Sequence, residues 1–82
     1  MADTKTIEER VMEVVARVFR KDANELTKDT RFIEDLHAKS LNIIELTAVL
    51  EDEFDISIPS AEARKRKTIG EAIALIESLV QK

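Results

Sequence analysis

The chain has 82 residues, enough for one small domain spanning residues 1–82 but few for a large buried catalytic cleft. It has no cysteine, which excludes a disulfide framework and a thiolate metal site. A formal net charge of −4 at pH 7 argues against general nucleic-acid binding. Hydrophobic residues make up 44% and charged residues 37%, with one glycine and one proline, and this balance favours an all-α protein.

The distribution of apolar residues argues against a membrane protein. No apolar run approaches the roughly 20 residues that a membrane span requires. The N-terminal residues also lack the apolar core of a signal peptide. We therefore expect a cytoplasmic monomer without stable membrane insertion, kept in solution by its net negative charge.

Apolar spacing predicts a first helix over residues 6–19. Thr6 and Glu9 have the spacing of a capping box, in which each side chain accepts the backbone N–H of the other residue. A long connection over residues 20–39 follows, and a loop of this length usually serves a function or contains extra turns. The apolar stripe of the helix consists of Ile7, Val11, Val14, Val15 and Val18.

A second predicted helix, over residues 40–54, carries apolar residues on two faces. Two interpretations of the second face are open: it is buried against a neighbouring element, or it docks a basic partner through apolar anchors and steering carboxylates. The natural core face holds Ile43, Leu46, Leu50 and Phe54. The opposite face holds Leu41, Ile44 and Ala48 among Glu45, Glu51, Asp52 and Asp55.

The last third of the chain predicts one short and one longer helix. Ser60 is placed to cap a short helix ending near Arg66. Thr68 and Glu71 again have the spacing of a capping box, at the start of a helix over residues 69–80. The apolar face of this last helix consists of Ile69, Ala72, Ile73, Ile76, Leu79 and Val80.

Ser40 stands where the long polar connection gives way to the second helix. It has two possible roles there. As an N-cap, its hydroxyl accepts a backbone N–H that the first helical turn leaves unpaired. As an attachment point, it carries a phosphodiester, because unpaired N–H groups and the helix dipole favour an anion at that end.

Five segments stand out in order along the chain: Thr6-Ile7-Glu8-Glu9-Arg10-Val11, Phe32-Ile33-Glu34-Asp35-Leu36, Ser40-Leu41, Leu50-Glu51-Asp52-Glu53-Phe54 and Ile58-Pro59. In this order and spacing they resemble the acyl carrier proteins of fatty acid and polyketide synthesis. The resemblance implies a four-helix bundle in which Ser40 carries 4′-phosphopantetheine, transferred from coenzyme A by a separate phosphopantetheinyl transferase. Acyl groups would ride as thioesters on the terminal sulfur of this arm, which supplies the thiol that the chain itself lacks.

The resemblance also implies an acyl pocket and a docking face. The partners would be acyl-transferring, condensing and other acyl-processing enzymes with basic docking surfaces. A purely structural role as core is equally compatible with the pocket residues. The pocket would be lined by Phe32, Leu36, Leu46, Leu50, Ile58, Ala63, Ala72 and Ile76, and partners would contact Leu41, Ile44, Glu45, Ala48, Glu51 and Asp52.

Catalysis by the chain itself is not expected. His37 lies near Ser40 in the sequence, but no third group and no nucleophile-elbow glycines accompany the two residues. The remaining rival to a carrier is a protein-interaction module with a carrier fold, in which Ser40 is only a helix cap.

Several residues depart from the family pattern. Lys39 precedes Ser40 where Asp is usual, Asn42 replaces a common acid, and His37 stands where glycine is common. The basic run Arg64-Lys65-Arg66-Lys67 lies in a region that is usually acidic or apolar, and Arg66 occupies a position that usually lines the pocket with an apolar side chain. The run is either a solvated face or a recognition element for an acidic partner or a carboxylate-bearing substrate. These departures favour a specialised pathway over housekeeping fatty acid synthesis.

Overall fold

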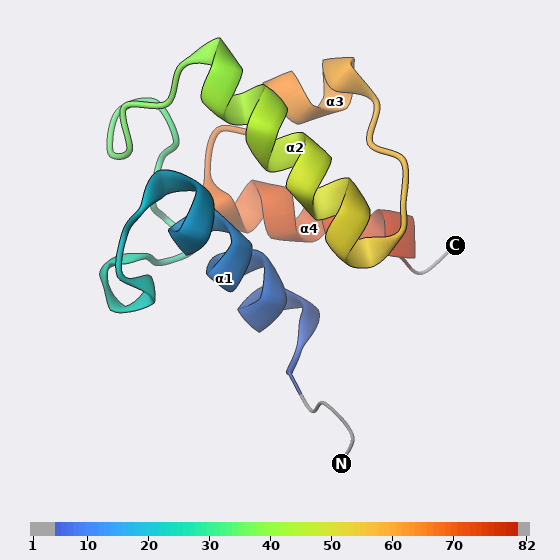
Figure 1. The fold of residues 1–82 in the computed structure, drawn as a ribbon, viewed down its shortest axis with the longest axis horizontal. Helices are drawn as coiled ribbons and strands as arrows, with labels where there is room; N and C mark the ends of the chain where they lie inside the picture. The colour runs from blue at the N-terminus through green and yellow to red at the C-terminus, as the bar shows by residue number, and fades with distance from the viewer. Residues whose placement is uncertain (1–4, 81–82) are drawn as a thin grey trace.

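The computed structural model describes residues 5–80 of the chain. This range contains four α-helices and one turn of 3-10 helix, joined by loops (Figure 1). The expectation of an all-α protein with three longer helices and one short helix is confirmed. The extra turn lies in the long connection after the first helix, as the length of that loop suggested. The elements are α1 (Ile7–Phe19), η1 (Ala23–Glu25), α2 (Ser40–Phe54), α3 (Ser60–Lys65) and α4 (Ile69–Val80).

Local capping interactions define both ends of α1. Thr6 Oγ1 accepts the Glu9 N–H at 3.1 Å, and Glu9 Oε1 accepts the Thr6 N–H at 2.9 Å, so the predicted capping box is confirmed. Arg20 ends the helix in the left-handed conformation, with φ 57°.

The start of α4 matches its predicted capping box only in part. Thr68 Oγ1 accepts the Glu71 N–H at 3.1 Å, as expected. The Glu71 carboxylate, however, accepts the N–H of Lys67 at 2.7 Å, one residue before the expected donor.

The short helix α3 begins differently from the sequence expectation. Pro59 occupies the N-cap position, and its carbonyl accepts the N–H groups of Glu62 and Ala63, both at 3.0 Å. Ser60 is therefore the first helical residue and makes no side-chain cap, so the prediction that it caps α3 is wrong. Arg66 is extended (φ −78°, ψ 121°) and leads the chain out of the helix towards α4.

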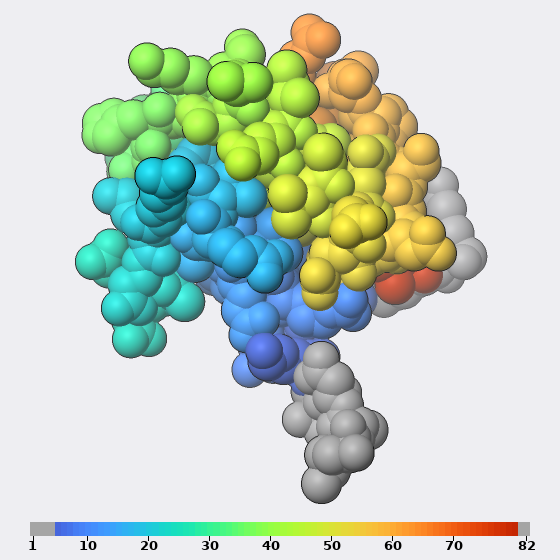
Figure 2. Space-filling view, viewed as in Figure 1, coloured from blue at the N-terminus to red at the C-terminus, as the bar shows by residue number. Residues whose placement is uncertain are grey.

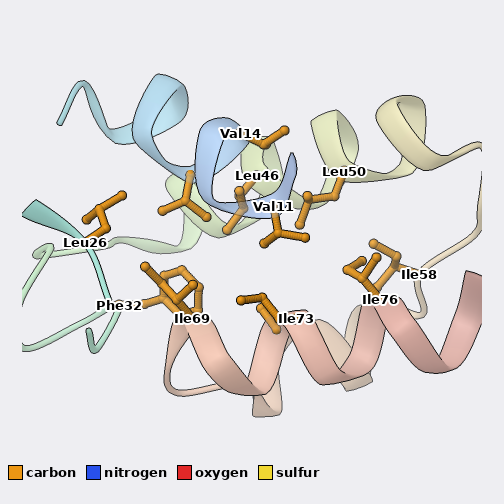
Figure 3. Packing of buried hydrophobic residues seen from close by; sticks show 12 residues of the cluster. Val11, Val14, Leu26, Phe32, Leu46, Leu50, Ile58, Ile69, Ile73 and Ile76 are labelled. Atoms are coloured by element: carbon orange, nitrogen blue, oxygen red, sulfur yellow. The ribbon is translucent and has the colours of Figure 1, made fainter. Parts of the chain in front are cut away.

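The core lies where α1 and α2 pack against each other and over α4 (Figure 3). Val11 of α1 and Leu46 and Leu50 of α2 point towards α4 in this view. Phe32 and Leu26, from the long loop, close one end beside Ile69, while Ile58 closes the other. The buried residues are Val11, Val14, Val15, Leu26, Phe32, Leu46, Leu50, Ile58, Ile69, Ala72, Ile73 and Ile76.

Backbone hydrogen bonds tie the long loop to the start of α4. Phe32 N–H donates to Lys67 O, and Ile69 N–H donates to Thr30 O, both at 3.0 Å. Gly70 N–H donates to Lys28 O at 2.9 Å, and a Cβ atom at position 70 would lie only 3.0 Å from that oxygen. The absence of a side chain at Gly70 thus permits this close approach.

Candidate functional site

Ser40 is the first residue of α2, and its side chain is exposed. The N-cap is Lys39, whose backbone is extended (φ −109°, ψ 171°) and whose ammonium group has no lone pair with which to accept an N–H. The N-cap interpretation of Ser40 is therefore wrong by one residue, because a residue inside the first turn no longer faces the unpaired N–H groups as a cap does. The Ser40 hydroxyl makes no hydrogen bond to any residue in the range 5–80, which leaves it available for chemistry.

The surroundings of Ser40 favour an anion. The first helical hydrogen bond of α2 runs from Ile43 N–H to Lys39 O at 3.1 Å, so the N–H groups before Ile43 have no acceptor within the helix. No acidic residue lies in the first turn, and Lys39 adds a positive charge beside the hydroxyl. Asn42 helps to order the turn, because its Oδ1 accepts the Lys39 N–H at 2.8 Å. A phosphodiester on Ser40 fits this electrostatic environment.

Hydrogen bonds within residues 31–38 hold the loop segment that leads to Ser40. Asp35 accepts hydrogen bonds from the backbone and the guanidinium of Arg31, at 2.8 to 3.2 Å, and these bonds hold the pKa of Asp35 below its ordinary value. His37 adopts φ 55°, a left-handed conformation that favours glycine, and Ala38 N–H donates to Phe32 O at 2.9 Å. The chain therefore reaches Ser40 from a fixed direction.

The two faces of α2 lie as the sequence predicted. Leu46 and Leu50 are buried, whereas the side chains of Leu41 and Ile44 are 73% and 64% exposed. Glu45, Ala48 and Asp52 are also exposed, and α2 crosses the visible face of the molecule in Figure 2. The exposed apolar residues of α2 are therefore not a second buried face. The loop adds Ile33, which the sequence suggested as one of the apolar residues that pin the loop but which is 67% exposed. That expectation is wrong, because an isoleucine in a loop has no periodicity to reveal its direction.

Glu51 does not project to solvent with the other carboxylates of α2. It is half-buried, and its Oε2 accepts the N–H of Ile58 at 2.7 Å. This corrects its expected place on the docking face. The carboxylate holds the segment after α2, because the backbone N–H of Ile58 needs an acceptor where the chain folds back.

A small apolar cavity lies between α2, α3 and α4. Its volume is about 30 Å³, close to the space that one water molecule takes up. Seven of the eight residues expected around an acyl chain line this cavity. The eighth, Leu36, lines a separate hollow beside η1, so its expected place in the pocket is wrong. The lining consists of Phe32, Ile43, Leu46, Thr47, Leu50, Ile58, Ala63, Arg66, Ala72, Leu75 and Ile76.

Three of these lining residues were missed by the sequence analysis. Ile43 was assigned to the core face alone, and Thr47 was not assigned to any face. Leu75 lies three residues after Ala72, so helical periodicity would have identified it. The small side chains of Ala63 and Ala72 leave the space that the larger residues enclose.

Two further properties concern the described residues as a whole. Within residues 5–80, no group of three or more His, Asp or Glu side chains is arranged to hold a metal ion. No helix in this range is long and apolar enough to cross a membrane.

Comparisons with known proteins agree with this geometry. Residues 9–76 match the family described as "Phosphopantetheine attachment site". The chain is 46% identical over 77 residues to the acyl carrier protein of Rickettsia canadensis, covering 94% of this chain and 90% of the relative. It is 47% identical over 70 residues to the acyl carrier protein of Helicobacter hepaticus, covering 85% of this chain and 92% of the relative.

A solved structure supports the same assignment. A Mycobacterium tuberculosis protein assigned as an acyl carrier protein superposes with a TM-score of 0.83 at 32% sequence identity, covering 89% of this chain and 97% of that one. Sequence match, fold and the exposed serine at the start of α2 point the same way. The chain therefore belongs to the acyl carrier protein family, whose members bear a phosphopantetheine attachment site.

Proposed function

We propose that this chain carries acyl groups as thioesters on a 4′-phosphopantetheine arm joined to Ser40. In the loading step the Ser40 Oγ–P bond forms as the pyrophosphate bond of coenzyme A breaks. Adenosine 3′,5′-bisphosphate leaves, and the serine proton passes to the transferase. The observation that carries the proposal is the exposed, unbonded hydroxyl of Ser40 in the first turn of α2, within the region that matches the attachment-site family.

The chain itself binds and presents the arm, and other enzymes change the cargo. The arm supplies the thiol, since the sequence contains no cysteine. The helix N-terminus and Lys39 stabilise the phosphodiester, and the hydrogen-bonded loop before Ser40 directs the arm away from the core.

Partner enzymes dock on the exposed face of α2. Leu41, Ile44 and Ala48 provide apolar anchors, and Glu45 and Asp52 steer a basic partner surface. Neither carboxylate forms an ion pair with another residue in the range 5–80, so both are available to a partner. A small interface with electrostatic steering suits a carrier that must bind and release several enzymes in turn.

The cavity shelters the acyl chain after expanding. At about 30 Å³ it must widen before it admits several methylene groups, each of which gains about 0.8 kcal/mol on burial. α3 is the element most suited to move, because it has six residues and none of them is buried.

The residues that depart from the family pattern, Lys39 and the basic run Arg64-Lys65-Arg66-Lys67, support a role in a specialised pathway.

Loading of Ser40 is tested by intact-mass measurement after incubation with coenzyme A and a broad-specificity phosphopantetheinyl transferase. The wild type and Ser60→Ala should each gain one phosphopantetheine, and Ser40→Ala should gain none. Ser60 is a matched control because it too is an exposed serine at the first position of a helix. A wild type that stays unmodified with several transferases would leave the interaction module as the better explanation.

A further inference from the structure

The basic run Arg64-Lys65-Arg66-Lys67 divides in the folded chain. Arg64, Lys65 and Lys67 are exposed, whereas Arg66 is half-buried and lines the cavity between α2, α3 and α4. A cationic side chain in this otherwise largely apolar lining calls for a physical reason.

The Nε–H group of Arg66 is buried and has no hydrogen-bond partner among residues 5–80. Glu62 forms an ion pair with Arg66, with its Oε1 3.6 Å from Nη2. This contact partly compensates the charge but is too long for a hydrogen bond, and it does not reach Nε. An arginine that merely covers apolar surface with its methylene stem keeps its N–H groups in water. Arg66 instead buries one donor without an acceptor, an arrangement that is unfavourable until an acceptor arrives.

A second polar group lines the same cavity. Thr47 Oγ1 donates its proton to Ile43 O at 2.7 Å, so its lone pairs stay available to accept a hydrogen bond. The remaining lining side chains are all hydrocarbon. The cavity thus combines apolar walls for methylene groups with one cationic donor and one hydroxyl acceptor.

We propose that this cavity takes acyl chains that carry an oxygen acceptor away from the thioester, held by the Nε–H of Arg66. A carboxylate at the far end of the chain is the strongest such acceptor, because guanidinium and carboxylate form charge-assisted hydrogen bonds that offset the cost of burying the charge. A hydroxyl oxygen is a weaker acceptor for Arg66 but can also donate to Thr47. The inference rests on the proposed carrier function and names the class of its cargo.

The test compares acyl chains that differ only in their far end. A broad-specificity transferase loads Ser40 from acyl-coenzyme A thioesters of four, six and eight carbons that end in a methyl group, a hydroxyl or a carboxylate. Intact mass confirms loading, thermal unfolding gives Tm, and the Nε–Hε signal of Arg66 is followed by ¹⁵N NMR. For at least one chain length, an oxygen-ended chain should give a Tm about 4 °C higher than its methyl-ended equivalent and shift the Arg66 signal.

Variants separate the role of Arg66 from general charge effects. Arg66→Leu should fold, because leucine suits the apolar lining, and it should lose the preference for oxygen-ended chains. Arg64→Leu removes an exposed charge from the same run and should keep the preference. Arg66→Lys keeps the charge but lacks Nε–H, and should lose most of the shift in Tm.

The outcomes distinguish the two proposals. Failure of Ser40 to load overturns the carrier function and this inference with it. Normal loading with equal Tm values for all three chain ends, at every length, overturns the inference alone. A higher Tm with oxygen-ended chains that persists in Arg66→Leu also overturns the inference. If only the carboxylate-ended or only the hydroxyl-ended chain loses its higher Tm in Arg66→Leu, that chain end identifies the cargo.

Discussion

Leu46 and Ile44 lie two residues apart in α2 but face opposite environments. The side chain of Leu46 is 4% exposed and packs in the core, whereas that of Ile44 faces solvent. Truncating Leu46 creates a cavity, so Leu46→Ala should lower the free energy of unfolding by about 2–5 kcal/mol. Ile44→Ala should lower it by no more than about 0.5 kcal/mol and should instead weaken partner docking.

Urea denaturation measures the first effect, and titration with the transferase measures the second. Equal losses of stability in Leu46→Ala and Ile44→Ala would contradict the assignment of the two faces of α2.

Lys39 occupies an N-cap position that it cannot satisfy with its side chain. Lys39→Asp introduces an oxygen that can accept the N–H of Asn42 and places a negative charge at the helix N-terminus, so we expect a gain of about 1 kcal/mol in stability. It also removes a like charge from the path of a basic transferase. At low salt, Ser40 should therefore be modified faster in Lys39→Asp than in the wild type, and most of this gain in rate should disappear at high salt.

Lys39→Ala is the control for that prediction, because it removes the charge without adding a cap. Its modification rate should rise without the gain in stability. Identical rates for the wild type and Lys39→Asp would show that position 39 does not influence the transferase.

At the scale of elements, Arg10 joins α1 to the end of α2. Its Nη2 donates to the backbone oxygen of Glu53 at 2.9 Å, and its Nε donates to the Glu53 carboxylate at 3.2 Å. The guanidinium also lies 4.3 Å from the centroid of the Phe54 ring. A cation beside the last carbonyl groups of a helix is favourable, so one side chain stabilises both the helix end and the packing of two helices.

Arg10→Ala should therefore lower the free energy of unfolding by about 1–2 kcal/mol. Arg10→Lys should lower the free energy of unfolding by less than Arg10→Ala, because it keeps the positive charge. Some loss should remain, because lysine cannot make both hydrogen bonds in the same geometry. Urea denaturation is the measurement, with Arg17→Ala as the control, since Arg17 is exposed on the same helix. A similar loss of stability in Arg17→Ala would mean that removing a positive charge from α1, and not breaking the contact with α2, sets the value.

At the scale of the molecule, charge is unevenly distributed. Residues 41–55 contain five acids and no base, whereas residues 64–67 are all basic. Folding then reduces the acidic set that faces outward, since Glu51 bonds to Ile58 and Glu53 bonds to Arg10. Three carboxylates, those of Glu45, Asp52 and Asp55, are left exposed and without an ion pair among residues 5–80. In the proposed docking, Glu45 and Asp52 steer partners towards α2.

Reversing these charges should act on association. Glu45→Lys and Asp52→Lys should each lower the association rate with a basic partner by about tenfold at low ionic strength, with little change at high salt. Stopped-flow measurements over a range of salt concentrations test this. Glu77→Lys, which changes an exposed acid on α4, should leave the rate nearly unchanged, and an equal effect there would contradict a localised docking face.

The sequence by itself determined the helices, the two faces of α2 and the position of Ser40 at the start of a helix. These depend on interactions within a few residues: the capping box of Thr6 and Glu9, the spacing of Leu46 and Leu50, and the change from polar loop to helix at residue 40. Most of the lining of the cavity between α2, α3 and α4 was also predictable, but from resemblance to the family and not from periodicity.

Only the tertiary structure decided which polar side chains turn inward. Glu51 reaches the N–H of Ile58, and Arg66 leaves its exposed neighbours to line the cavity beside Thr47. The loop before Ser40 is held by bonds to Lys67 and Ile69, more than 30 residues away. No local pattern encodes such pairings, because they arise when separate helices bury their apolar faces together and the polar groups at the edges must then find partners.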